Sequence, residues 1–168
     1  MKKLVVLAIA ITAMACQQNK IAFVDSVKIM DEYQEKIDVD ARFKTKAEAM
    51  NKKRDSISQA FQMELQQFQT KAQSMSQQKA QEEYSLLQQR GQRVGQQLQQ
   101  EEQQLQQISQ AEMDTLVKKV KKEIREYGKA NGYTYILGGG ESGSVIYGDE
   151  AKDVTDAILT ILNDKYEN

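Results

Sequence analysis

QAFQMELQQFQTKAQSM, residues 59–75, and YSLLQQRGQRVGQQLQQEEQQLQQI, residues 84–108, decide the fold of this chain. Apolar side chains recur in both stretches at steps of mostly three, four or seven residues, the spacing of one face of an α-helix. Residues 38–127 contain no Pro and only two Gly, so little interrupts a helix over that length. The pattern predicts two long helices.

The two predicted helices each carry one apolar stripe. Around residues 74–78 the phase between the stripes is lost, and we place the turn of an antiparallel hairpin there. At about 1.5 Å per residue, each arm of the hairpin would reach on the order of 55 Å. The stripes consist of Phe43, Ala47, Met50, Ile57, Phe61, Leu65, Phe68, Ala72 and Met75, and of Tyr84, Leu87, Gly91, Val94, Leu98, Leu105 and Ile108.

The predicted seam between the arms is narrow and interrupted. One stripe per helix suffices to pair two helices but leaves little apolar surface for a third layer. Charged residues fall into the seam at Arg54, Glu64 and Glu101. Gly91 and Gly95 each weaken the second helix by roughly 1 kcal/mol relative to Ala and are candidate bending points.

Gln supplies 21 of the 52 residues from Gln59 to Gln110. Gln has fair helix propensity and a neutral side chain that both donates and accepts hydrogen bonds. The pattern is open to two interpretations. One is an ordinary soluble helix surface, and the other is a low-charge, adaptable wall against which an unfolded chain can lie without being trapped.

Strand-like segments lie on both sides of the hairpin. Residues 21–24 and 133–137 alternate or cluster β-branched and aromatic residues, and residues 144–147 read as a further strand that pairs with 133–137 through a glycine-rich loop. Asp25 and Ser26 offer a cap for a short helix over residues 27–33, and Asp153 is the expected N-cap of a last helix. Its inward-facing residues are expected to be Val154, Ile158, Leu159, Ile161 and Leu162.

The sequence therefore predicts an α+β fold, with a small β-rich head and a long antiparallel α-helical hairpin. Residues 16–37 and 128–168 form the head, and residues 38–127 form the hairpin. The core of so small a head is marginal alone, and sharing strands between subunits would enlarge it, so we expect a homo-oligomer. The strand residues expected at that assembly surface are Ile21, Phe23, Val24, Tyr135, Ile136, Val145 and Ile146.

The first residues predict export. Lys2 and Lys3 precede a short apolar run, and small residues lead up to Cys16, the only Cys of the chain. Residues 1–15 resemble a lipoprotein signal peptide, in which Cys16 becomes the lipid-modified N-terminus. The alternative is an ordinary signal peptide. Two or more acyl chains on one residue would attach the protein durably to a membrane.

Composition argues against catalysis. The chain has no His and no Trp, which removes common nucleophile partners and metal ligands. The glycines at 138–140 are not followed by the Lys-Ser/Thr of a phosphate-binding loop. We expect no enzyme, no catalytic residue, no metal and no cofactor. With 15 basic and 12 acidic residues between 40 and 127 and a formal net charge of -1 overall, we also expect no nucleic-acid partner.

Both head segments resemble the Skp/OmpH family of periplasmic chaperones. The opening strand at residues 20–25 (KIAFVD), the closing strands at 133–147 and the Asp153-Val154-Thr155 helix start are similar to those of the family. The resemblance covers essentially the whole chain after the signal peptide. It implies a homotrimer with a β-barrel-like body and three helical tentacles, which holds unfolded outer-membrane proteins in the periplasm without ATP.

Two features depart from the family pattern. Well-known members are strongly basic soluble proteins, whereas this chain is slightly acidic and carries the predicted lipid anchor, which we expect in the outer membrane. Apolar contact by the tentacle is therefore the expected substitute for capture by positive charge. The candidate contact residues are Phe43, Met50, Phe61, Phe68 and Met75, whose alternative role is the helix–helix seam.

A rival interpretation is a structural coiled-coil lipoprotein that braces or spaces the cell envelope. A holdase needs arms that open and expose apolar surface transiently, whereas a brace needs arms that pair into one continuous bundle. The narrow, interrupted seam favours the holdase.

Overall fold

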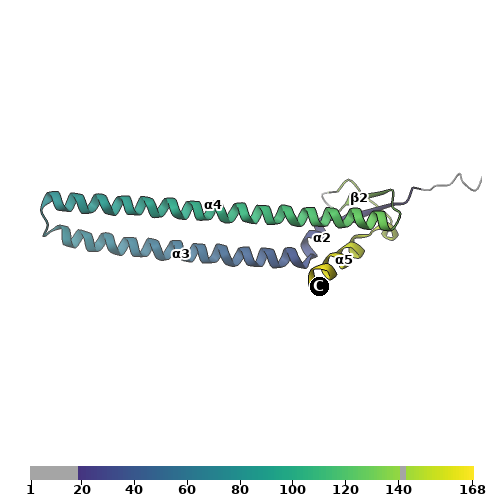
Figure 1. The fold of residues 1–168 in the computed structure, drawn as a ribbon, viewed down its shortest axis with the longest axis horizontal. Coiled ribbons are helices and arrows are strands. Elements are labelled where there is room, and N and C mark those ends of the chain that lie inside the picture. Colours follow the sequence, from purple (N-terminus) through teal and green to yellow (C-terminus); the bar gives the residue numbers. More distant parts are fainter. Residues whose placement is uncertain (1–18, 141–142) are drawn as a thin grey trace, which may run out of the picture. The chain divides into compact units, whose positions relative to one another are not determined.

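The computed structural model describes residues 19–140 and 143–168, so the predicted signal peptide and Cys16 lie outside the described residues (Figure 1). Its elements are β1 (Ile21–Asp25), α2 (Ser26–Glu32), α3 (Gln34–Ala72), α4 (Gln77–Ala130), β2 (Tyr135–Gly139), the short 3-10 helix η1 (Glu150–Lys152) and α5 (Thr155–Glu167). They divide into two compact units. Residues 19–36 and Val117–Asn168 form the head unit, and Ile37–Leu116 form the hairpin unit. The predicted fold class, a small sheet with a long helical hairpin, is confirmed.

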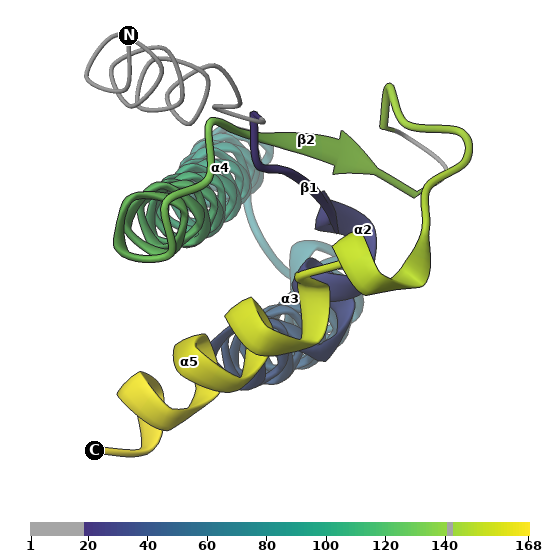
Figure 2. The same ribbon diagram turned by 90° about the vertical axis from the view of Figure 1, so that its right-hand side faces the viewer.

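The sheet of the head consists of two parallel strands. Ile21 pairs with Tyr135 and Phe23 with Leu137, so these four side chains share one face of the sheet. β1 and β2 lie side by side in Figure 2. Parallel strands need a long crossover connection, and here the whole hairpin supplies it. Ala22 and Val24 point to the other face and are buried. The remaining buried apolar residues of the head are Ile29, Tyr33, Val120, Val154, Ile158, Leu159 and Leu162.

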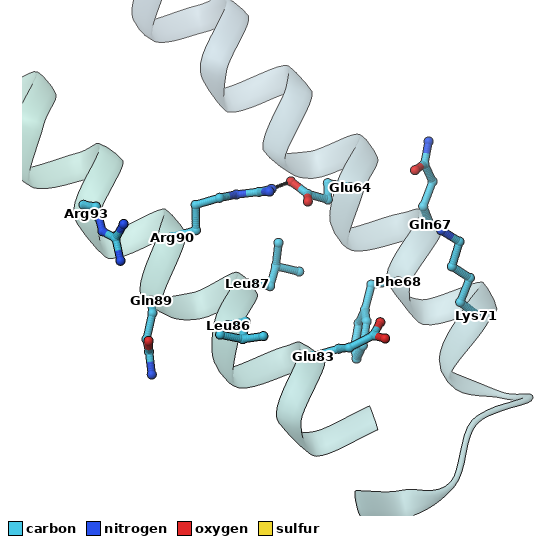
Figure 3. Close-up of a pocket in the computed structure, with 10 residues that line it drawn as sticks. All are labelled: Glu64, Gln67, Phe68, Lys71, Glu83, Leu86, Leu87, Gln89, Arg90 and Arg93. Atoms are coloured by element: carbon cyan, nitrogen blue, oxygen red, sulfur yellow. Dashed lines mark ion pairs between the residues drawn. The ribbon is translucent and has the colours of Figure 1, made fainter. Parts of the chain in front are cut away.

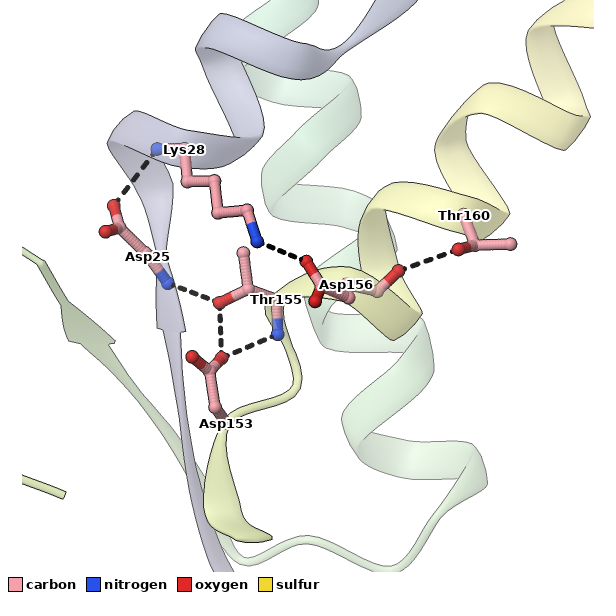
Figure 4. Close-up of polar contacts among 6 residues, drawn as sticks. All are labelled: Asp25, Lys28, Asp153, Thr155, Asp156 and Thr160. Atoms are coloured by element: carbon pink, nitrogen blue, oxygen red, sulfur yellow. Dashed lines mark hydrogen bonds and ion pairs between the residues drawn. The ribbon is translucent and has the colours of Figure 1, made fainter. Parts of the chain in front are cut away.

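A chain of polar contacts ties β1 to α5 (Figure 4). Asp25 caps α2 by accepting from the backbone N–H of Val27 at 2.9 Å, as predicted. Its own N–H donates to Oγ1 of Thr155 at 2.9 Å, and that hydroxyl donates in turn to Asp153. Thr155 is almost completely buried, so this network satisfies polar groups that would otherwise be costly inside the core.

The start of α5 differs from the expectation. Val154, and not Asp153, occupies the N-cap position, and it makes no side-chain cap hydrogen bond. The Asp153 carboxylate instead accepts a hydrogen bond at 2.8 Å from the backbone N–H of Thr155, the first residue of α5. The backbone of the preceding residues explains the shift, because Asp153 ends η1 and forms an isolated bridge with Phe23 of β1.

The predicted strand at residues 144–147 is wrong for the single chain. Val145 forms only an isolated bridge with Gly139, and its N–H donates to the Gly138 carbonyl at 3.0 Å. Ile146 is 100% and Tyr147 91% exposed. Their β propensity is real, but a strand needs a continuous ladder, and beyond the single bridge at Val145 these residues form no ladder with β2. The glycines at 138 and 139 belong to β2 itself and do not form a loop.

The hairpin unit contains most of α3 and α4, which run antiparallel side by side (Figure 1). The turn lies at residues 73–76, where the apolar stripes lose phase. Ser74 and Met75 donate backbone hydrogen bonds to Lys71 and Ala72, which closes the last turn of α3. The first helix of the hairpin, α3, begins at Gln34, earlier than the expected start near residue 38. Only Tyr33 separates it from the end of α2 at Glu32, so the two helices follow each other almost directly.

No helix among the described residues is long and apolar enough to cross a membrane.

Candidate functional site

The seam of the hairpin unit is only partly closed. Leu87 is buried at its distal half, and Val39 and Leu116 are buried toward its other end. Most other stripe residues are half-buried, and Tyr84 and Ile108 are exposed at 45% and 51%. A two-helix pair without a third layer cannot cover its apolar stripe from both sides. The seam therefore keeps apolar surface within reach of solvent.

The five candidate contact residues of the tentacle are all half-buried, and four of them lie on α3, whereas Met75 lies in the turn at residues 73–76. Phe68 stacks on Tyr84 of the other helix, with ring centroids 5.8 Å apart. Met50 lines a shallow hollow of about 410 Å³ with Leu105 and Ile108. The structure distributes them along the arm and does not gather them into one patch. The full set is Phe43, Met50, Phe61, Phe68 and Met75.

Ion pairs cross the seam at regular intervals. Arg42 pairs with Glu112, Lys53 with Glu101 at 2.5 Å, Arg54 with Glu102 at 2.9 Å, and Glu64 with Arg90. All three charged residues that interrupt the apolar stripes are therefore partnered across the seam. Each pair is half exposed and contributes at most about 1 kcal/mol. Their combined effect is to fix the register of the two helices, as polar residues do in coiled coils.

The ion pair between Lys53 and Glu101 also affects titration. The side-chain hydrogen bond from Lys53, followed by one from Gln97, lowers the pKa of Glu101 below its ordinary value. Glu101 therefore remains charged at neutral pH although it occupies a seam position.

A hollow of about 450 Å³ lies near the turn of the hairpin (Figure 3). Phe68 and Leu87 point into it, and the ion pair of Glu64 with Arg90 lies along one side. Its wall is mixed, since Gln67, Lys71, Glu83 and Arg93 also contribute.

Among the exposed apolar residues of the hairpin unit that were not singled out from the sequence, two are more than half exposed. Leu86 is 64% and Met63 57% exposed. Both lie beside a stripe position and not on it, and this offset was the signal that could have identified them. Leu86 also lines the hollow near the turn, and both exposed side chains are candidates for contact with a bound chain.

A second hollow, of about 380 Å³, lies beside the two glycines of α4 and has mostly apolar walls. We call it the Gly95 hollow. The ring of Phe61 fills the space over Gly91, where an added Cβ would lie 2.8 Å from Phe61 Cζ. Nothing lies within 4 Å of a Cβ added to Gly95. The lining residues are Arg54, Ile57, Ser58, Ala60, Phe61, Glu64, Arg90, Gly91, Val94, Gly95 and Leu98.

The head unit carries an exposed apolar sheet face. Ile21 is 41%, Tyr135 57% and Leu137 43% exposed, and Phe23 lies half-buried between them. The structure thus brings three of the predicted assembly residues, Ile21, Phe23 and Tyr135, onto one face. Val24 and Ile136 lie on the opposite face, and Val145 and Ile146 lie in the loop after β2.

A polar cluster joins the start of α3, the end of α4 and α5 within the head unit. Tyr33 donates its hydroxyl hydrogen to Glu35, Lys119 pairs with the same carboxylate, and Lys165 pairs with Glu123 at 2.6 Å. Burial and the hydrogen bond to Glu35 raise the pKa of Tyr33. Burial alone would raise the pKa of Glu35, but the hydrogen bonds from Lys119 and Tyr33 outweigh it and lower that pKa.

This cluster predicts an acid-sensitive contribution to the stability of the head. A carboxyl group whose pKa is lower in the folded than in the unfolded state stabilises the fold at pH values above the unfolded-state pKa. This stabilisation is lost as the pH falls through the folded-state pKa. For Glu35 the loss begins near its ordinary pKa of 4.5 and continues below it. We expect Glu35→Gln to unfold more readily than the parent at pH 7, by about 1 kcal/mol or less for a half-exposed pair.

Urea unfolding at pH 7, 5 and 3 measures this effect. The difference between Glu35→Gln and the parent should shrink as the pH falls. Glu48→Gln, which changes an exposed carboxyl of the same helix, is the control and should leave the pH dependence unchanged. An equal difference at all three pH values would show that the charge of Glu35 is not responsible.

No cluster of three or more potential metal ligands occurs in the described part of the chain.

Comparison with known proteins finds a matching family model and several similar solved structures. The model of the family described as outer membrane protein (OmpH-like) matches residues 20–162. A crystal structure from Caulobacter crescentus, described as a candidate OmpH-like outer membrane chaperone, superposes with a TM-score of 0.78 at 17% identity, covering 90% of this chain and 88% of that one. At this identity the superposition shows the fold alone. Among curated proteins no sequence matches.

Proposed function

The chain belongs to the OmpH-like family of outer membrane proteins, and from that premise we propose that it is a periplasmic holdase, which binds unfolded outer-membrane proteins and prevents their aggregation without ATP. We call the bound unfolded protein the client. No step of such holding requires catalysis, a metal or a cofactor.

The observation that carries the proposal is the half-closed seam of the hairpin unit. A seam with buried Leu87 but half-buried neighbours holds the helices together while leaving apolar surface for a client. The Gln-rich outer surface adds neutral hydrogen-bonding groups. Many weak contacts of this kind can hold a chain by their combined avidity, while each contact alone releases easily.

The proposal extends to assembly. The apolar sheet face of the head is exposed in the single chain, and patches of this kind mark interaction surfaces. We propose that three copies bury their sheet faces against one another in a homotrimer with a β-barrel-like body. Ile146 and Tyr147 are exposed and are strand-forming residue types, and no strand of the described residues pairs with them.

Light scattering during dilution of a urea-unfolded outer-membrane β-barrel protein tests the function. We expect the protein to suppress aggregation at about one trimer per client, with no effect of added ATP. Absence of suppression by a folded trimer would overturn the holdase proposal.

The four ion pairs across the seam favour a second candidate function, a structural lipoprotein that braces the cell envelope. Fixed register and paired arms suit a spacer, whose arms have to stay in one continuous bundle. The same scattering experiment separates the two, because a brace has no reason to suppress aggregation.

The lipid anchor is a separate prediction. We expect Cys16 to carry acyl chains that hold the protein at the outer membrane, since two or more chains give stable attachment. Intact-mass spectrometry of the exported protein should show cleavage before Cys16 and the added lipid. Cys16→Ala should move the protein from the membrane fraction to the soluble fraction. A mature mass without lipid would contradict the anchor.

A further inference from the structure

The last part of α4, which belongs to the head unit, carries positive charge on one side. Residues 117–130 contain six basic and two acidic residues. Five of the basic residues are exposed and are spaced so that they share one side of the helix. The buried residues Val120 and Glu123 lie on the other side. We call the five exposed residues the basic face: Lys118, Lys121, Lys122, Arg125 and Lys129.

Most of the charge of the basic face is not neutralised by the chain itself. Four of its five cations form no ion pair among the described residues, and the exception is Lys122, which lies 3.7 Å from Glu126. The other carboxylate of this segment, Glu123, is 8% exposed and pairs with Lys165 of α5. The basic face therefore keeps positive charge that is available to an anion outside the chain.

The start of the described chain is fixed at the same end of α4. Lys20 donates from Nζ to the carbonyl of Asn131 at 2.9 Å, and its Nζ lies 4.2 Å from the ring centroid of Tyr133. The backbone N–H of Thr134 donates to the carbonyl of Lys20 at 2.8 Å. Because Asn131 follows Lys129 by two residues, Lys20 lies next to the C-terminal end of the basic face.

The predicted lipid anchor is joined to this end of the head by a short tether. Cys16 precedes Lys20 by four residues, and four residues of fully extended chain span at most about 14 Å. The attraction between basic residues and anionic lipids falls off within a Debye length, which is about 8 Å at physiological ionic strength. A tether less than twice as long as this keeps the end of α4 close to the surface charge of the membrane.

We propose that the basic face binds the anionic phospholipid headgroups of the membrane that holds the lipid anchor, and so fixes which side of the head faces that membrane. Ammonium and guanidinium groups form charge-assisted hydrogen bonds to phosphate oxygens. The face extends over about 16 Å of helix, from Lys118 to Lys129, and can contact more than one headgroup. The chain as a whole has a formal net charge of -1, so an anionic surface attracts this face without attracting the whole molecule.

Vesicle sedimentation tests the proposal with the chain from Gln17 onward, which lacks the lipid and contains every described residue. The vesicles consist of phosphatidylcholine alone or of phosphatidylcholine and phosphatidylglycerol in equal amounts. The face variant replaces the four unpaired cations by Gln, and the control variant removes as much charge from exposed lysines of the hairpin unit that form no ion pair among the described residues. The face variant is Lys118→Gln, Lys121→Gln, Arg125→Gln and Lys129→Gln, and the control variant is Lys44→Gln, Lys52→Gln, Lys71→Gln and Lys79→Gln.

We expect the parent to sediment with the phosphatidylglycerol vesicles and not with phosphatidylcholine alone. Each Lys or Arg near an anionic surface strengthens binding by about fivefold, so the face variant should bind about a hundredfold more weakly or less. The control variant should bind as the parent does, and circular dichroism verifies that both variants are folded. Equal binding of the parent and a folded face variant would overturn the proposal, as would a parent that does not bind the anionic vesicles.

Two salts at equal ionic strength distinguish a lipid surface from a site for free phosphate. Sodium chloride and sodium phosphate should release the parent from the vesicles equally, because both screen the surface charge. Stronger release by phosphate would show that the basic face binds the free anion, and the docking proposal would then fail.

The proposal rests on the predicted lipid anchor, and the outcomes separate the two. If the intact mass shows the lipid but the lipid-free chain does not bind anionic vesicles, the anchor stands and the basic face is not a docking surface. If the lipid-free chain binds but the mature mass shows no lipid, the basic face is a membrane-binding surface and the anchor fails.

Discussion

Replacing Tyr135 and Leu137 together by Asp should convert the proposed trimer into monomers. Both side chains lie on the apolar sheet face of the head and are about half exposed in the single chain. Two buried carboxylates per subunit would have no partner at the interface, and unpaired buried charges cost several kcal/mol each. Because the same side chains face solvent in the monomer, the fold of the single chain should tolerate the change.

Sedimentation equilibrium measures the mass, and circular dichroism confirms that the helices remain. The matched control replaces Met63 and Leu86 together by Asp, since it introduces the same two charges at exposed apolar residues of the hairpin unit. That variant should retain the mass of the parent. We also expect the Tyr135/Leu137 variant to lose most aggregation suppression, because a trimer gathers three arms around one client. A double variant that remains trimeric would place the interface elsewhere.

Ile158→Ala should destabilise the head by about 3 kcal/mol, within the range of 2–5 kcal/mol found for large-to-small changes at buried sites. Ile158 has 0% exposure and lies on the inward face of α5. The head is small, and a small core has little reserve against a cavity. The variant should therefore unfold the head at urea concentrations where the hairpin still persists.

Tyrosine fluorescence and far-ultraviolet circular dichroism separate the two units. The chain lacks Trp, and all tyrosines except Tyr84 belong to the head unit, so fluorescence reports on the head. Ellipticity reports mainly on α3 and α4. Ile161→Ala on the same helix is the control and should cost less, since Ile161 is half-buried. Equal losses in both variants would show that α5 is not held by the core around Ile158.

The hairpin was predictable because its signal is periodic over many turns. The stripes ending at Met75 and restarting at Tyr84 located the turn without any knowledge of tertiary contacts. The partners of the interrupting charges were not predictable. In the sequence these partners look like ordinary surface residues. Only the register of the two helices places Glu102 opposite Arg54, Arg90 opposite Glu64 and Lys53 opposite Glu101.

The head shows where local propensity is insufficient. Residues 144–147 have the composition of a strand, but the single chain offers them only the bridge at Gly139. Conversely, the glycines at 138 and 139 read as loop residues, yet they extend β2. At Gly139 an added Cβ would lie 2.9 Å from the ring of Phe23, so the close approach of β1 requires glycine there. Such contacts between distant segments leave no periodic signal.

The candidate site was predictable in outline but not in detail. Sequence periodicity placed Phe61 and Phe68 on the seam and left open whether they bind a client. It could not distinguish Gly91 from Gly95, because both are glycines in one helix four residues apart. Only the position of the Phe61 ring shows that one is filled and the other is open.

The parallel pairing of β1 with β2 has a consequence for the order of folding. Contacts in the head join residues that are distant in sequence, such as Glu32 and Asn163, which lie 131 positions apart along the chain. The entropy of closing so long a loop must be overcome before the sheet can form. Pairing of α3 with α4 begins at a local turn and shortens that loop step by step, so the hairpin should form first and the sheet last. During export β1 emerges long before β2, and until then its apolar residues have no partner. A newly exported molecule therefore passes through a stage in which it resembles its own proposed clients.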